Sequence, residues 1–174
     1  MAVRMAISRR DLEIHQYPVP VYLLVMLVAL VLQALLPRVL GPRHIWYDFP
    51  LVITIYFALA RRSPIGGMLI GGAMGIFQDA LTGHAIGVYG IAKTISGYLA
   101  ASVGVRIDVQ NTLIRVVLNF SLTVLCSAIY LVIYRVLLGM EFDWNWPNTL
   151  FQAIGNSILA LIIFPLLDRF QVKD

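Results

Sequence analysis

The chain has 174 residues, of which 60% are hydrophobic and only 13% are charged, and its formal net charge is +4. Its mean hydropathy of +0.84 excludes a soluble domain, because one core of this size cannot hide so much apolar surface. The positive charge lies in short segments between apolar runs, without the basic, aromatic-rich stripe of a protein that binds nucleic acid. We therefore expect an integral membrane protein that binds no nucleic acid.

The amino-terminal part of the chain predicts a polar tail followed by a first membrane span. Residues 1–17 are polar and carry three arginines, and we expect them to form a cytoplasmic tail. The apolar run 19–36 is close to the roughly 20 residues that cross the hydrocarbon layer. A signal peptide would have a shorter apolar core and a small-residue cleavage site, so we expect this span to be retained.

The second apolar run, 46–60, is short for a membrane span. Asp48 is a good helix cap, and Pro50 is tolerated in a first helical turn, where backbone amides have no intrahelical partner. Counted from Phe49, the helix would be only about 18 Å long. Either residues 45–47 extend it, or it is a short helix that its neighbours shield from lipid.

Four further apolar runs complete the chain, and polar loops separate them. They cover residues 65–81, 86–105, 113–138 and 149–167. No linker, repeat or low-complexity tract divides the sequence. It therefore predicts an all-α fold, a bundle of six transmembrane helices that forms a single transmembrane domain over residues 1–174.

The distribution of charge predicts the orientation of these six spans. An even number of spans places most of the thirteen Lys and Arg residues on one side: Arg4, Arg9, Arg10, Arg61, Arg62, Arg106, Arg115, Arg169 and Lys173. The other side receives Arg38, Arg43 and Arg135, together with all three tryptophans, which suit a membrane boundary. Because basic residues accumulate on the cytoplasmic side, we expect both termini in the cytoplasm.

The clearest pattern in the chain is a series of residues, mostly glycine, at intervals of four. Its members are Gly67, Gly71, Gly75, Asp79, Gly83 and Gly87. The first four fall on one face of the third predicted helix, where glycine lets a second backbone approach closely. This face could pack inside the bundle, receive a partner's helix or line a ligand cavity, and the sequence leaves these alternatives open.

Asp79 and Lys93 are the most informative polar residues, because ionisable groups inside a span are costly and usually face protein or water. If the hairpin turns near Gly83 and His84, the two backbones differ in depth by about 7.5 Å. A lysine stem covers much of that distance, so we predict a Lys93–Asp79 ion pair. The alternatives are contact with a partner or ligand, or extension of Lys93 toward lipid headgroups.

The sequence lacks the residue patterns that are typical of catalytic and metal-binding sites. No two of the three histidines have metal-ligand spacing, and no nucleophile elbow, phosphate-binding loop or dinucleotide fingerprint occurs. The only cysteine, Cys126, lies within an apolar run, where a buried hydrophobic role is the ordinary one. We expect no enzyme, no catalytic or metal-binding residue and no cofactor.

Three features stand out together: Asp48-Phe49-Pro50, the Arg61-Arg62 turn, and the glycine-rich stretch from Gly71 to Gly87 that runs through Asp79 and Gly83. In these features the chain, from Trp46 to its end, resembles the rod shape-determining MreD family of bacterial inner-membrane proteins. Gly97-Tyr98, after Lys93, fits as well. The length and the six expected spans also agree with the family.

The resemblance implies a noncatalytic scaffold of the machinery that elongates rod-shaped cells. Its implied partners are the bitopic protein MreC, the glycosyltransferase RodA, a penicillin-binding transpeptidase and MreB filaments, besides membrane lipid. It also implies a fold like that of the substrate-binding subunits of energy-coupling-factor transporters. Such a vitamin-binding subunit is the alternative function, and it would need a solvent-reachable pocket with convergent polar groups.

Overall fold

The computed structural model describes residues 18–40, 47–107, 111–139 and 145–170, and within these ranges it contains helices joined by short turns and no strand. Three helices form the first half: α1 (Val19–Leu40), α2 (Phe49–Arg61) and α3 (Pro64–Thr82). Three more form the second half: α4 (Val88–Gly104), α5 (Thr112–Val132) and α6 (Trp146–Asp168). The last turns of α5 continue as a π-helix, η3 (Ile133–Leu137). The all-α prediction is confirmed, and each predicted apolar run corresponds to one helix.

Helix boundaries follow local capping chemistry. The Asp48 side chain accepts a hydrogen bond from the Leu51 amide at 3.0 Å, so the predicted cap of α2 is confirmed. Ser63 caps α3 in the same way, accepting from the Gly66 amide at 3.2 Å. α1 continues past the predicted end of the first apolar run at residue 36, through Pro37 to Leu40. Proline removes only one helical hydrogen bond, a loss that is tolerated in a helix packed within a membrane.

The short α2 is the central helix of the bundle. Every residue from Pro50 to Ala60 is buried, whereas the longer helices each keep an exposed apolar face. α2 contacts all five other helices. Of the two predictions for this segment, the shielded short helix is therefore correct: Tyr47 and Asp48 are not helical, and residues 45–46 lie outside the described part of the chain.

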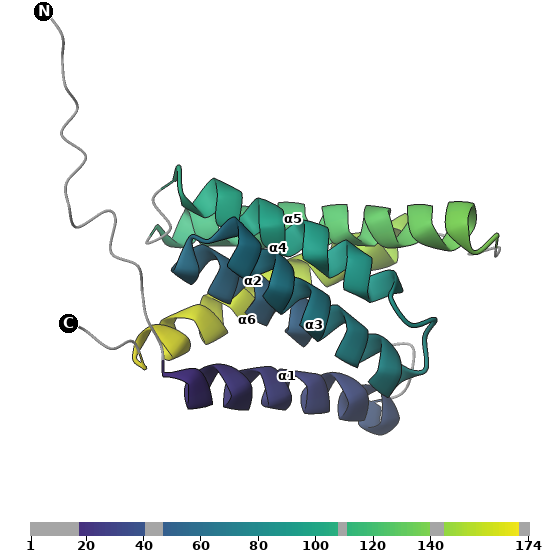
Figure 1. Cartoon of the computed structure of the whole chain (residues 1–174), viewed down its shortest axis with the longest axis horizontal. Helices are drawn as coiled ribbons and strands as arrows, with labels where there is room; N and C mark the ends of the chain where they lie inside the picture. Colours follow the sequence, from purple (N-terminus) through teal and green to yellow (C-terminus); the bar gives the residue numbers. More distant parts are fainter. Residues whose placement is uncertain (1–17, 41–46, 108–110, 140–144, 171–174) are drawn as a thin grey trace, which may run out of the picture.

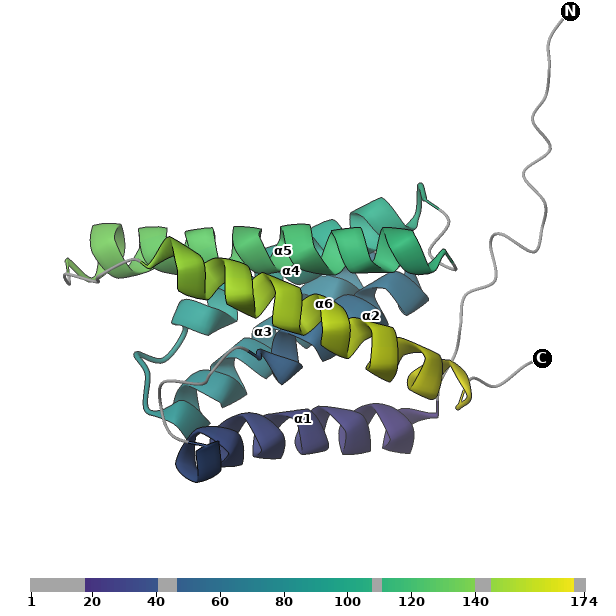
Figure 2. The same cartoon turned by 180° about the vertical axis from the view of Figure 1, so that it is seen from behind.

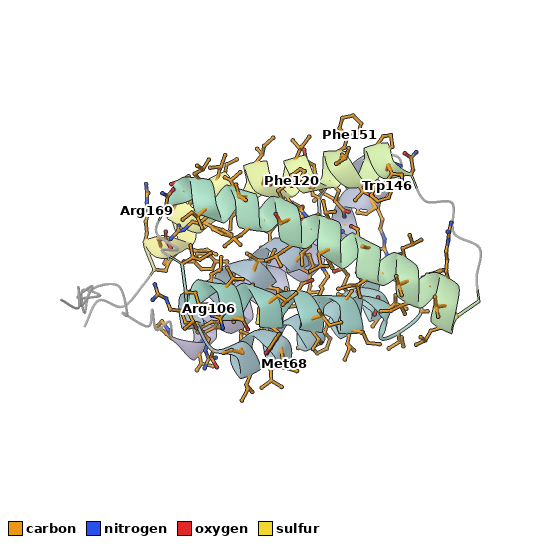
Figure 3. The ribbon with its side chains drawn as sticks, turned by 90° about the horizontal axis from the view of Figure 1, so that it is seen from above. Met68, Arg106, Phe120, Trp146, Phe151 and Arg169 are labelled. Atoms are coloured by element: carbon orange, nitrogen blue, oxygen red, sulfur yellow. The ribbon has the colours of Figure 1, made fainter. Side chains whose placement is uncertain are left out.

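The helices run roughly side by side, and α1 lies along one edge of the bundle (Figure 1). α1 begins and α6 ends at the same end of the bundle, as both views show (Figures 1 and 2). Arg106 and Arg169 lie at this end, and Trp146 lies at the opposite one (Figure 3). The Arg61 guanidinium also lies here, 5.7 Å from the ring centre of Tyr22 near the start of α1. We call this the basic end.

The helices α1, α3, α5 and α6 are each long and apolar enough to cross a membrane. With the broad exposed apolar faces of the bundle, this makes the chain a multi-pass membrane protein. α2 and α4 are shorter, with 13 and 17 residues. Six membrane crossings with both termini in the cytoplasm stay a prediction. The predicted tail 1–17, Trp46, Trp144 and the basic residues Arg4, Arg9, Arg10, Arg43 and Lys173 lie outside the described residues.

Candidate functional site

The glycines spaced four apart on α3 pack directly on the backbone of α4. A Cβ atom added at Gly67, Gly71 or Gly75 would overlap a backbone carbonyl of α4, that of Gly97, Lys93 or Tyr89 in turn. The three carbonyls belong to residues that are four apart along α4, so the two helices are in contact along one continuous seam. Since backbone atoms cannot rotate away from a clash, glycine is required at these positions.

Gly83 and Gly87, the last two residues of the series, make no close packing contact and are instead needed for their backbone conformation. Gly83 ends α3 with φ 72°, and Gly87 precedes α4 with φ 101°. An added Cβ would meet no atom within 4 Å at either position. Both angles lie in the left-handed region that other residues rarely adopt, so the two glycines shape the turn between α3 and α4.

Asp79 is fully buried and caps the start of α4. Its Oδ2 accepts hydrogen bonds from the amides of Gly87 at 2.8 Å and Tyr89 at 3.1 Å. Gly87 has no side chain with which to cap the helix, and its φ is positive. Asp79 therefore supplies from the end of α3 the acceptor that the first turn of α4 lacks, and a carboxylate is favourable at this positive end of a helix.

The predicted Lys93–Asp79 pair is wrong, because the Lys93 ammonium pairs with Asp48 instead. Both side chains are buried, with exposed fractions of 0% for Lys93 and 3% for Asp48. The Lys93 ammonium also lies 5.3 Å from the ring centre of Tyr89. The prediction considered only the α3–α4 hairpin, whereas α2 lies within the bundle and brings its amino-terminal cap to Lys93.

Asp48 extends this ion pair to α5 and α6. Its backbone amide donates to Asn156 Oδ1 at 2.8 Å, and Asn156 Nδ2 donates to Thr123 Oγ1 at 3.1 Å. Beside it, the Phe49 amide donates to Gln33 Oε1 of α1 at 3.1 Å. We call these residues the polar core: Gln33, Asp48, Lys93, Thr123 and Asn156. It joins α1, the start of α2, α4, α5 and α6.

Asn119 adjoins the polar core without joining it. Thr123 Oγ1 donates to the Asn119 backbone carbonyl at 2.7 Å, so the two residues share a face of α5. The Asn119 side chain is fully buried, and neither its oxygen nor its nitrogen has a hydrogen-bond partner among the described residues. This contradicts the ordinary role expected of an asparagine in a span, a hydrogen bond to a neighbouring helix.

The basic end carries a second group of interactions, which is partly buried. Asp168 Oδ2 accepts from Arg115 Nη1 at 2.6 Å, and Asp168 Oδ1 accepts from the Tyr56 hydroxyl at 2.8 Å. These contacts hold the end of α6 against α2 and the start of α5. Since the Arg115 and Asp168 side chains are 17% and 29% exposed, solvent weakens this pair relative to the buried one.

Sequence reasoning predicts that Asn156 bonds to another helix, which is confirmed, but it assigns no role to Gln33; both residues contact the start of α2. They were visible as polar residues inside apolar runs, and that signal identifies groups that need a partner. It does not identify the partner, because their contacts lie 108 and 16 residues away along the chain.

The buried polar groups mainly bind one another and helix ends. Within the described residues no group of three or more His, Cys, Asp or Glu could hold a metal ion. Lys93 and Asp79 are both buried and engaged by partners inside the chain. The arrangement therefore fixes the relative positions of five helices, which is a structural task.

These features define a class: a multi-pass helical membrane protein with a glycine seam and a buried ion pair at its centre. The family model of the rod shape-determining protein MreD matches residues 14–170, and the chain belongs to that family. MreD is a structural, shape-determining family and is not known for catalysis. No curated protein and no solved structure matches the chain. The expected likeness to energy-coupling-factor subunits thus stays a prediction.

Proposed function

We propose that this protein is a noncatalytic scaffold of the bacterial cell-elongation machinery, located in the cytoplasmic membrane. It binds an MreC-like bitopic protein and helps to couple MreB filaments to peptidoglycan synthesis by RodA and a penicillin-binding transpeptidase. The observation that carries this proposal is the family match over residues 14–170, since members of the family determine rod shape.

The geometry of the site supports a scaffold in preference to a transporter subunit. A vitamin-binding subunit needs convergent polar groups that a soluble ligand can reach. Here Lys93, Asp48 and Asn156 are buried and bonded to one another. A rigid polar core instead holds the outer faces of the helices in fixed positions, and a scaffold needs such surfaces to position its partners.

The test is to purify the tagged full-length protein from its native membrane in mild detergent and to identify copurifying proteins by mass spectrometry. A tagged, unrelated multi-pass protein from the same membrane is the control. We expect specific recovery of a bitopic periplasmic protein and of cell-wall synthases. Recovery of two cytoplasmic ATPases with a second membrane subunit would show a transporter component and refute the proposal.

A cellular test complements this experiment. Deletion of the gene should turn rods into round cells, and the wild-type chain should restore the rod shape. Unchanged rods in the deletion strain would contradict the proposed function, provided that no second copy of the gene is present.

A further inference from the structure

An apolar groove runs between α5 and α6, away from the polar core, with a volume of about 360 Å³. It is lined by Val116, Val117, Phe120, Ile154, Ser157, Ile158 and Leu161. Figure 3 shows Phe120 between the two helices. The volume lies within the range of roughly 300–1,000 Å³ that is typical of small-molecule sites.

The groove offers hydrocarbon contacts and no open hydrogen-bonding group. Its single polar side chain, Ser157, donates to the Ala153 carbonyl at 2.8 Å and lies 3.4 Å from the Val116 carbonyl oxygen. A polar ligand would lose its hydrogen bonds to water here without gaining others. The chemistry of the lining therefore selects a hydrocarbon chain.

The groove opens to the lipid-facing surface of the bundle. Val117, Ile158 and Leu161 are 54%, 52% and 44% exposed. Closely packed transmembrane helices commonly meet at small residues that allow the backbones to approach, as glycine does between α3 and α4. The lining is instead branched or aromatic apart from Ser157, which favours a thin, flexible acyl chain over a helix.

Positive charge lies beyond the groove toward the basic end. Val116 is about 6 Å from the start of α5, which is the positive end of that helix. Arg169 is exposed and follows Ile158 by three helical turns, so it continues the same face of α6 about 16 Å further on. The Asp168 carboxylate at this end is compensated by Arg115, so the exposed Arg169 leaves a net positive charge that favours a negatively charged headgroup.

We propose that the α5–α6 groove binds an acyl chain of an anionic phospholipid from the leaflet that borders the basic end. The acyl chain lies along Val117, Phe120 and Ile158, and the headgroup phosphate lies beside the exposed Arg169. This site goes beyond the proposed scaffold function and does not depend on it.

The first experiment is native mass spectrometry of the full-length protein in detergent, titrated with dioleoyl phosphatidylglycerol or dioleoyl phosphatidylcholine. The two lipids have identical acyl chains and differ in net headgroup charge. We expect the anionic lipid to bind about fivefold more tightly, the effect of one arginine near a headgroup. Equal affinities would overturn the anionic assignment.

The groove itself is tested by V117W, which fills it from an exposed position. The matched control is V132W, on the same helix with a similar exposed fraction of 57% and outside the groove. V117W should weaken binding of both lipids about tenfold, as one filled hydrocarbon subsite does, while V132W should not. Equal effects would overturn the site. L161W replaces V117W if that variant does not fold.

The headgroup position is tested by R169Q against R106Q, which removes the same charge at the same end but follows α4. Only R169Q should abolish the preference for the anionic lipid. Equal losses would show general electrostatic attraction and overturn the headgroup site. A photocrosslinker at Val117 in cells should label lipid, and a protein adduct there would assign the groove to a partner chain instead.

Discussion

The α3–α4 and α5–α6 hairpins join long apolar helices in two different ways. In the first, glycine brings the two backbones into contact along Gly67, Gly71 and Gly75. In the second, branched and aromatic side chains keep the backbones apart and leave an open groove. In a membrane the hydrophobic effect gives little drive for helix association, so the size of the residues at the seam decides how closely helices approach.

The two hairpins also use polar residues differently. The ionisable groups of α3 and α4 both have partners. Asp79 accepts from a backbone amide at the start of α4, and Lys93 forms an ion pair with Asp48. α5 buries Asn119 without a hydrogen-bond partner among the described residues. We therefore expect substitutions at the glycine seam, Lys93 and Asp79 of the first hairpin to be costly and substitution of Asn119 in the second to be tolerated, and four variants test this difference.

The largest effect is expected for K93M, which leaves the buried Asp48 carboxylate without its cation. Removing one partner of a buried ion pair costs about 3–5 kcal/mol. The thermal midpoint in detergent should therefore fall sharply. The double variant K93M/D48N removes both charges and keeps an oxygen to cap α2, so it should recover much of the loss. A double variant as unstable as the sum of its parts would contradict the pair.

G71A comes next, because its Cβ would overlap the Lys93 carbonyl and force the two helices apart. Overpacking of this kind costs about 1–3 kcal/mol or more. The matched control is G66A on the same helix, where the added Cβ meets the Ser63 hydroxyl at 3.3 Å and no α4 backbone. Thermal denaturation should separate the two variants. Equal midpoints would show that the glycine seam is not needed.

D79N should have a moderate effect. It keeps an oxygen that can accept from the Gly87 and Tyr89 amides but removes the negative charge at the start of α4. A charge-assisted bond exceeds a neutral one by roughly 1 kcal/mol, so we expect a loss of about 1–2 kcal/mol. Hydrogen exchange should rise in the first turn of α4 before other helices open. Uniform exchange across all helices would refute this capping role.

N119L should have the smallest effect, with a free energy of unfolding that is unchanged or slightly raised. Leucine has a similar shape and removes two buried polar atoms that lack partners. The comparison variant is N156L, which breaks bonds to the Asp48 amide and Thr123 and should lose about 2 kcal/mol. If both asparagines prove equally important, Asn119 has a partner outside the described residues.

The sequence by itself determined the helices and most of their ends. Apolar runs of span length predict the α-helices because lipid leaves backbone groups no other partners. The Asp48 cap and the turn at Gly83 depend on neighbouring residues, so local chemistry predicts them. The repeat of Gly67, Gly71 and Gly75 likewise predicts a face for close packing, although it does not name the helix that occupies it.

Only the tertiary structure decided which residues the buried polar and charged side chains contact. Lys93 pairs with Asp48, 45 residues away, because α2 lies at the centre and directs its cap toward α4. Asp79 is left to bind the amides of its own hairpin, and Asn156 reaches Asp48 across 108 residues. A buried charge requires a partner, but which residue meets it depends on how the helices pack, and that packing is set by contacts far apart in the chain.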